Sequence, residues 1–207
     1  MIQYHVEMED LTRIEAALGM MKDKSKMVLR TAINNAAKQT EDRMVSEAKG
    51  RYRYKNGRKG DIREANDIKK AKVSSLSATI TATGPVNELL DFHVKPSTYF
   101  PGSKGAPKWI KARALRESKL QNIALFPSAS GDKYKAFVIK YKSGHLALAQ
   151  RVPGQRMKSK PHKEAVKSLL SIATPKMEEV VYKTEIDHDM YDILQRNIQE
   201  QIIRYLG

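Results

Sequence analysis

The sequence has no cysteine and no long run of apolar residues. Without thiols, the chain has no disulfides, no thiolate zinc sites, no iron–sulfur clusters and no cysteine nucleophile. Its apolar runs are only a few residues long, far short of the ~20 residues that span a bilayer. No apolar stretch follows a basic start at the N-terminus, so we expect a soluble chain that keeps its N-terminus and does not enter a membrane.

The usual signatures of catalysis are also missing. Neither glycine-rich phosphate-binding motif occurs, which argues against nucleotide hydrolysis and dinucleotide binding. A metal-dependent nuclease needs clustered carboxylates near its basic surface, yet residues 104–163 contain only Glu117 and Asp132. We therefore expect a protein that is not an enzyme and that has no catalytic residue, cofactor or resident metal.

One acidic cluster near the C-terminus is the exception to weigh. This cluster offers oxygen and imidazole ligands for a divalent cation. Its members are Glu185, Asp187, His188, Asp189 and Asp192. The favoured interpretation is simpler: Asp187 and Asp189 cap the start of the last helix and interact with its dipole. The other histidines stand far apart in the sequence and show no metal-binding spacing.

What the sequence does have is positive charge. The chain has 38 lysines and arginines and 23 acidic residues, which gives a formal net charge of +15. Residues 49–72 hold 10 basic and 3 acidic side chains and residues 104–163 hold 15 and 2, whereas both ends of the chain are slightly acidic. Charge gathered in this way favours an acidic protein surface or a nucleic acid as partner. It also suits a head-to-tail ring, in which acidic ends meet the basic middle of the next copy.

Periodicity predicts a single α+β domain over residues 1–207. Helical spacing of apolar residues predicts a long N-terminal helix over about 24–49 and a last helix near 189–206. Strict alternation predicts a strand over 76–82. The fold class is therefore α+β, with an antiparallel or mixed sheet in the middle and C-terminal helices packed against the N-terminal helix. Proline and glycine predict long basic loops at about 95–108 and 153–162.

A hairpin is predicted over residues 135–152 with its turn at Ser143-Gly144. In this register, Tyr141 lies opposite Leu146 and Phe137 lies beside Gln150 on an apolar face. Lys140 and Lys142 then lie on an opposite, basic face.

The basic residues of the loops and of the expected sheet face are the candidates for contact with a DNA channel or a partner. Tyr52, Tyr54 and Trp109 lie among them and could stack on bases. The candidates are Arg51, Arg53, Lys55, Lys104, Lys108, Lys111, Arg113, Lys140, Lys142, Arg156, Lys158 and Lys160.

The order of elements and several local patterns resemble the phage minor tail protein Z, or tail completion, family. The matching segments lie along nearly the whole chain, with the exception of the loops Thr98–Pro107 and Pro153–Pro161. They are Val28–Thr40, Arg51–Tyr54, Ile68–Ala71, Leu76–Gly84, Leu89–Phe92, Ala136-Phe137, Lys142–His145 before Arg151, and Ser171–Met177.

This resemblance implies a structural virion protein at the head-proximal end of a phage tail. It would be made in the host cytoplasm and would form a homo-oligomer, expected to be a ring of six around the DNA channel. Its partners would be the tail tube and the tail terminator or connector proteins, with non-specific contact to genomic DNA. The alternative from the residues alone is a cytoplasmic nucleic-acid-binding protein without sequence specificity; a nuclease is the least favoured.

Overall fold

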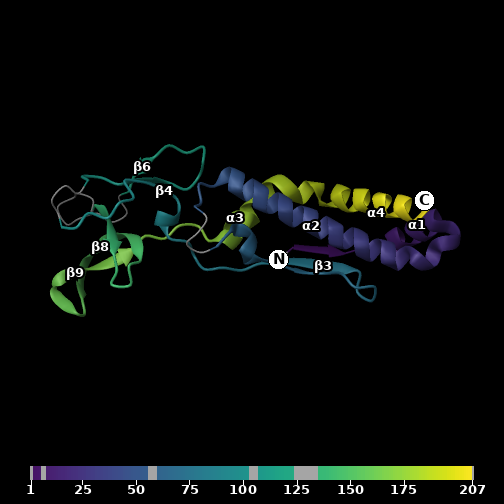
Figure 1. The fold of residues 1–207 in the computed structure, drawn as a ribbon, viewed down its shortest axis with the longest axis horizontal. Helices are drawn as coiled ribbons and strands as arrows, with labels where there is room; N and C mark the ends of the chain where they lie inside the picture. Colours follow the sequence, from purple (N-terminus) through teal and green to yellow (C-terminus); the bar gives the residue numbers. More distant parts are fainter. Residues whose placement is uncertain (1, 6–7, 56–59, 103–106, 124–134, 207) are drawn as a thin grey trace. The chain divides into compact units, whose positions relative to one another are not determined.

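The structure is a computed structural model that describes residues 2–5, 8–55, 60–102, 107–123 and 135–206. Its contacts divide the chain into two compact units, where the sequence predicts a single domain. We call Met1–Ala48, Asp61–Gly84 and Thr174–Gly207 the helical unit, and Lys49–Gly60 with Pro85–Ala173 the basic unit. Helices combine with antiparallel strands, so the α+β class is confirmed (Figure 1).

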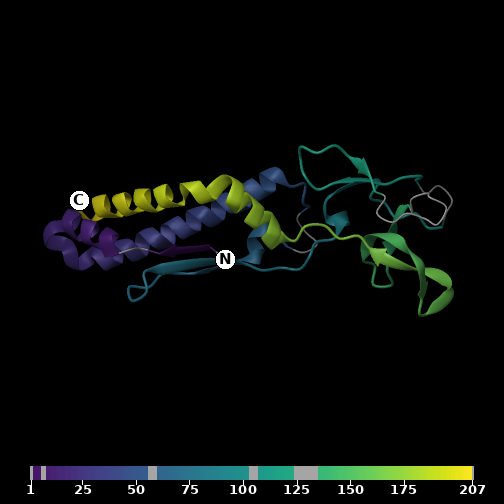
Figure 2. The same ribbon diagram turned by 180° about the vertical axis from the view of Figure 1, so that it is seen from behind.

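Three long helices dominate the helical unit. They are α1 (Met8–Leu18), α2 (Ser25–Arg51) and α4 (Met190–Leu206), with α3 (Thr174–Val181) before α4. The predicted helices at 24–49 and 189–206 are confirmed to within two residues. The α2 and α4 helices run side by side, as both ribbon views show, which confirms the predicted packing of C-terminal on N-terminal helix (Figures 1 and 2).

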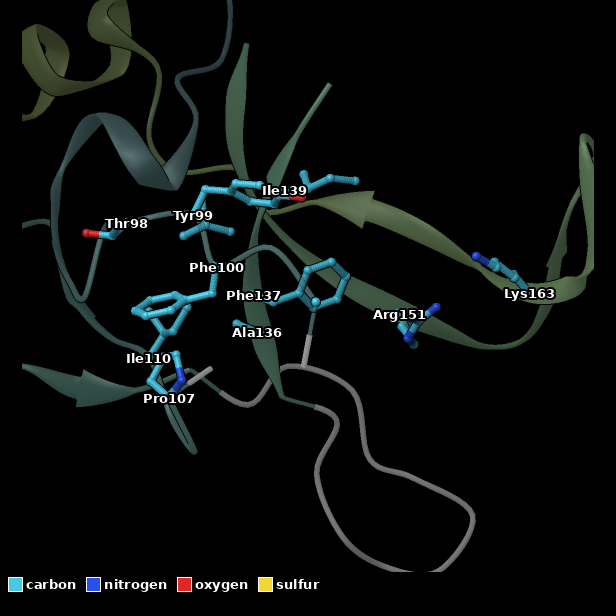
Figure 3. A pocket seen from close by; sticks show the side chains of 12 residues that line it. Thr98, Tyr99, Phe100, Pro107, Ile110, Ala136, Phe137, Ile139, Arg151 and Lys163 are labelled. Atoms are coloured by element: carbon cyan, nitrogen blue, oxygen red, sulfur yellow. The ribbon is translucent and has the colours of Figure 1, made fainter. Parts of the chain in front are cut away.

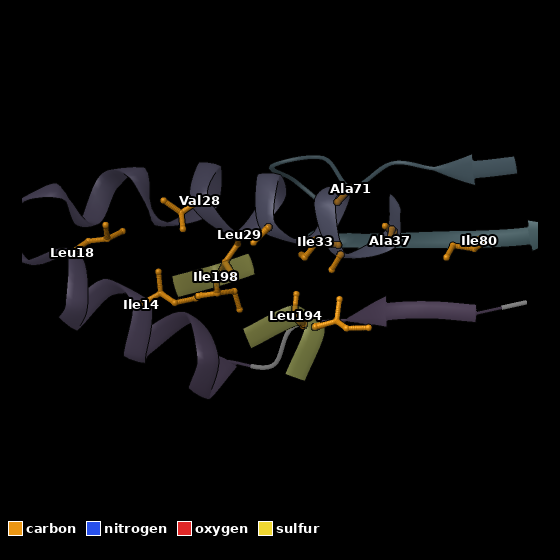
Figure 4. Close-up of a cluster of buried hydrophobic side chains, with 14 residues drawn as sticks. Ile14, Leu18, Val28, Leu29, Ile33, Ala37, Ala71, Ile80, Leu194 and Ile198 are labelled. Atoms are coloured by element: carbon orange, nitrogen blue, oxygen red, sulfur yellow. The ribbon is translucent and has the colours of Figure 1, made fainter. Parts of the chain in front are cut away.

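Small side chains on α2 allow this close packing. Ala32, Ala36 and Ala37 are fully buried, together with Leu29 and Ile33 on the same face. Apolar residues of α4 pack against this stripe, as Figure 4 shows for Leu194 and Ile198. Burial of apolar surface provides most of the stability of such a helix pair.

Paired amides fix the register of α2. Gln39 and Asn197 exchange side-chain hydrogen bonds between α2 and α4, with N–O distances of 3.4 and 3.1 Å. On another side, the Asn34 amide donates to the Ala71 carbonyl and accepts from the Ala71 N–H, at 3.2 and 2.7 Å. These contacts have defined geometry, so they select one alignment of the packed elements.

A small antiparallel sheet completes the helical unit. Its order is β1 (Ile2–His5), β3 (Ser77–Ala82), β2 (Asn66–Lys69), with Ile2 and Ile68 both opposite Ile80. The predicted strand at 76–82 is confirmed, and Ala78 and Ile80 are its buried residues.

The basic unit contains two further small antiparallel sheets. One consists of β4 (His93–Lys95), β5 (Lys111–Arg113) and β6 (Gln121–Asn122). The other consists of β7 (Ala136–Lys140), β8 (Leu146–Met157) and β9 (Lys160–Ser168), in that order. The described residues between 96 and 110 form no regular element, as expected for the first long loop.

The predicted register of the hairpin is wrong by one residue. Phe137 lies opposite Ala149, and Val138 opposite Leu148, because the loop has three residues rather than two. The Tyr141 N–H donates to the His145 carbonyl at 2.8 Å, and Gly144 has φ of +84°, the conformation that closes a three-residue loop. This shift exchanges the two faces.

The change of register changes which residues lie in the core. Val138 and Leu148 are buried in the core of the basic unit, whereas Phe137 lies on the opposite face and is half-buried. The predicted basic face made by Lys140 is wrong, because Lys140 and Leu146 lie opposite one another on the core side.

The second predicted loop, 153–162, is also wrong. These residues form the outer half of the long β8–β9 hairpin, whose turn follows Met157. Pro153 and Gly154 are accommodated where the register shifts between Arg151 and Arg156. A bulge of this kind tolerates proline, since the ladder is interrupted there.

Candidate interaction surface of the basic unit

The two units carry opposite net charges. From the sequence, the helical unit has 15 basic and 18 acidic side chains, a net charge of −3, whereas the basic unit has 23 and 5, a net charge of +18. All twelve candidate residues belong to the basic unit. With five carboxylates for 23 cations, most of this charge cannot be neutralised inside the unit, so it is available to an anionic partner.

Two basic segments that are far apart in the sequence lie side by side. The Arg53 N–H donates to the Ala114 carbonyl at 2.7 Å and the Arg116 N–H donates to the Arg51 carbonyl at 2.9 Å. These bonds bring Arg51 and Arg53 next to residues 114–116, which follow β5. The sequence placed these residues in separate segments and did not predict this contact.

The charge gathered there acts on a histidine. His93 lies opposite Arg113 in the β4–β5 pair. The pKa of His93 lies below its ordinary value, and burial is the largest cause. The next causes are the positive charges of Arg113, Lys95, Arg53 and Lys55. Protonation of the imidazole is thus disfavoured, and its Nδ1 accepts a hydrogen bond of 3.1 Å from Arg113 Nε.

Arg113 itself has a structural role. Besides His93, its guanidinium donates to the carbonyls of Arg116 and Ser118, at 3.1 and 2.9 Å. Its Nε and Nη1 groups therefore bond within the protein, and we no longer expect Arg113 to meet a partner.

The stacking role expected for the aromatic residues is not supported for two of them. Tyr52 is buried, with 4% of its surface exposed. The Tyr54 ring packs against Phe92, with ring centroids 5.6 Å apart, and its hydroxyl donates to Asn87 Oδ1 at 3.4 Å. Trp109 is half-buried.

The remaining candidates are exposed side chains on three parts of the unit. Arg51, Arg53, Lys55, Lys108 and Lys111 lie on or near the joined segments, Lys140 and Lys142 at the β7–β8 turn, and Arg156, Lys158 and Lys160 at the end of the β8–β9 hairpin. Lys104 lies outside the described residues.

A pocket of about 600 Å³ lies beside β7 (Figure 3). Its walls are mostly apolar, and two cations, Arg151 and Lys163, lie toward one end. The lining residues are Thr98, Tyr99, Phe100, Gly102, Pro107, Ile110, Ala136, Phe137, Val138, Ile139, Arg151 and Lys163. The sequence did not predict this site because the expected register placed Phe137 and Ile139 in the core. The arrangement can hold an apolar group next to a negative charge.

Two members of the acidic cluster near the C-terminus bond other side chains of the protein. Arg43 Nη1 bonds Asp189 at 2.6 Å, and the Tyr182 hydroxyl donates to Asp187. The hydrogen bond from Arg43 lowers the pKa of Asp189. Across the part of the chain that the structure describes, no group of three or more histidine or acidic residues is arranged to hold a metal ion.

The chain matches no family model, and comparisons with curated proteins and with solved structures found no match. Among the described residues, no helix is both long enough and apolar enough to cross a membrane.

Proposed function

We propose that this protein is a structural component of a phage tail that completes its head-proximal end. In this proposal, several copies form a ring around the DNA channel and join the tail tube to the connector. The protein acts by assembly rather than by catalysis, and its place of action is the virion. The resemblance of the sequence to the tail completion family is the origin of the proposal.

The observation that supports it best is the separation of charge, −3 in one compact unit and +18 in the other. A closed ring of identical copies uses two different surfaces of each copy, so surfaces of opposite charge favour head-to-tail contact. Positive charge on flexible lysine side chains also suits a channel through which DNA must move. Base-specific contacts, worth about 1–3 kcal/mol each, would instead hold the DNA in place.

The test is a mass measurement of the purified protein. Light scattering and native mass spectrometry are carried out on the protein alone and after mixing with the tail tube protein of the same particle. The proposal predicts a closed oligomer in at least one condition, with six copies expected. A monomer in both conditions would contradict it.

A second candidate function is supported by a different observation. The backbone bonds that join residues 51–53 to residues 114–116 gather cations into one patch. We propose as the alternative that this patch binds nucleic acid without sequence specificity outside any particle. A free monomer that binds duplex DNA at micromolar or tighter concentration near 150 mM salt, with affinity falling steeply as salt rises, would favour this function.

A further inference from the structure

We propose that the edge of β7 binds an extended acidic segment of another protein as an added strand. The segment would place an apolar side chain in the pocket beside β7 and a carboxylate near Arg151 and Lys163. This proposal goes beyond the tail function and does not depend on it. Recognition by strand addition combines main-chain hydrogen bonds with pockets for alternate side chains.

The β7 strand lies at the edge of its sheet. Among the described strands, β7 pairs only with β8, and β8 then pairs with β9. Antiparallel pairs alternate between residues that exchange hydrogen bonds and residues that do not. Since the Tyr141 N–H donates to the His145 carbonyl, Phe137 and Ile139 are the β7 residues that exchange main-chain hydrogen bonds with β8. The N–H and C=O groups of Val138 therefore point away from β8, toward the open edge.

The pocket follows this edge. Consecutive residues of β7 line it, and these alternate between the two faces of the sheet: Ala136 and Val138 on the core side, Phe137 and Ile139 on the other. A cavity that meets both faces of a strand must reach the strand's edge. Figure 3 shows Tyr99, Phe100 and Ile110 lining the pocket next to β7.

The lining combines aromatic rings with positive charge. Tyr99, Phe100 and Phe137 give the pocket aromatic walls, and Tyr99 is 38% exposed. Arg151 and Lys163 give it positive charge, within a unit of net charge +18. A pocket of about 600 Å³ with an apolar body and a cationic end fits an apolar side chain followed by a carboxylate.

A nucleotide is the rival occupant, because aromatic rings and cations also bind bases and phosphates. The position of Arg151 argues against it. Its guanidinium carbon lies 5.7 Å from the centroid of the Phe137 ring, so it already covers a face of the ring on which a base would stack. The open main-chain groups at the edge, moreover, match a peptide backbone rather than a sugar–phosphate chain.

The test uses the full-length protein and a set of labelled heptapeptides. Each peptide alternates glutamate with apolar residues and has phenylalanine, leucine or valine at its centre; binding is followed by fluorescence anisotropy. At least one peptide is expected to bind, and the same peptide with lysine in place of glutamate is expected to bind at least about tenfold more weakly.

Two pairs of matched reagents separate strand addition from simple charge attraction. Peptides N-methylated on the amides that face β7 should lose about tenfold or more in affinity, whereas N-methylation of the amides that face away should have little effect. Val138→Pro removes an outward N–H from the protein and should weaken binding by a similar factor relative to Val138→Ala. Where Val138→Pro does not fold, the methylated peptides carry the test alone.

Side-chain variants then locate the pocket. Arg151→Gln and Phe137→Ala should each weaken binding about tenfold, whereas Arg204→Gln, which removes an exposed cation from the helical unit, should not. The proposal is overturned if no peptide binds, if both methylation patterns act alike, or if Arg204→Gln acts as Arg151→Gln does. It is equally overturned if a thymidine oligonucleotide binds in place of the peptides with an affinity that Phe137→Ala removes.

Discussion

The helical unit neutralises its charges internally, and the basic unit does not. In the helical unit, Lys38 and Arg63 each bond both Glu41 and Asp42, at distances of 2.6–3.2 Å. The basic unit has too few carboxylates for such a network. The helical unit therefore pairs many of its charges within itself, whereas the basic unit keeps a large surplus of positive charge.

The same contrast appears in their cores. The helical unit has a continuous cluster over three helices and a sheet, and α2 contributes Val28, Leu29 and Ile33 to it. The core of the basic unit is a separate cluster, and only half of its buried residues lie on strands. Variants in the two units can break or sharpen this contrast, and the largest effect is expected in the core of the helical unit.

Truncation of the α2 core should cost most. Leu29→Ala removes a fully buried side chain from the helical cluster and should lower the free energy of unfolding by about 3–4 kcal/mol. Urea denaturation followed by circular dichroism measures this loss. The matched control is Met27→Ala on the same helix, where the side chain is 37% exposed and the change should stay below about 1 kcal/mol. Equal losses would show that the assignment of the α2 core is wrong.

A buried carboxyl should make the helical unit pH-dependent. Glu178 on α3 is fully buried, and its Oε1 accepts a hydrogen bond of 2.7 Å from Asn66, while Oε2 has no partner among the described residues. Burial raises the pKa of Glu178 from 4.5 to about 7. The hydrogen bond from Asn66 acts in the opposite direction and lowers this pKa. Of the nearby charges, Glu41 raises the pKa and Arg63 lowers it.

The sign of the pH effect follows from this rise. The folded protein holds the Glu178 proton that the unfolded chain loses above pH 4.5, so the stabilisation is complete at lower pH and disappears as pH rises to about 7. The free energy of unfolding should fall by up to about 3 kcal/mol between pH 5 and pH 8.

Glu178→Gln should remove this dependence. Glu179→Gln is the control, because the Lys183 and Lys176 hydrogen bonds lower the pKa of Glu179 to about 2, outside this window. A profile that Glu178→Gln does not alter would contradict the assignment.

Removal of exposed cations should weaken DNA binding when the cations belong to the basic unit, but not when they belong to the helical unit. The triple variant Arg53→Gln, Lys108→Gln and Lys111→Gln should reduce the slope of log affinity on log salt by about 0.9 for each phosphate that the protein no longer neutralises. The control neutralises three exposed lysines of the helical unit, Lys69, Lys70 and Lys72. Duplex DNA binding measured over a range of salt concentrations distinguishes the two. Equal reductions in slope would remove the functional difference between the units.

The surface ion pairs of the helical unit should contribute least. Asp42 lies 2.6 Å from Arg63 and 3.2 Å from Lys38, but its side chain is 48% exposed. Asp42→Asn should therefore cost less than about 1 kcal/mol, and the cost should shrink at high salt. Urea denaturation at low and high salt checks this against Asp67→Asn on β2. A cost above that of Leu29→Ala would mean that the network, rather than the core, holds the unit together.

Local patterns in the sequence were sufficient for the two longest helices and the central strand of the helical unit. The spacing of Leu29, Ile33 and Ala36 predicted α2, and the alternation around Ala78 and Ile80 predicted β3, because a single buried face imposes its period on the chain. The total charge and its concentration in the middle of the chain were also determined by the sequence alone.

Tertiary structure decided the register and the contacts. The conformation of Gly144 set a three-residue loop, and one residue of register moved Phe137 from the expected core to the pocket. Strand pairing extended through Pro153 and Gly154 by means of a bulge, although both residues predict a loop locally. The hydrogen bond from the Arg53 N–H to the Ala114 carbonyl joins residues that lie far apart in the sequence, as does the hydrogen bond from Asn66 to Glu178. Local propensity contains no information about such contacts, because they form only when the packing of the whole unit lowers the free energy.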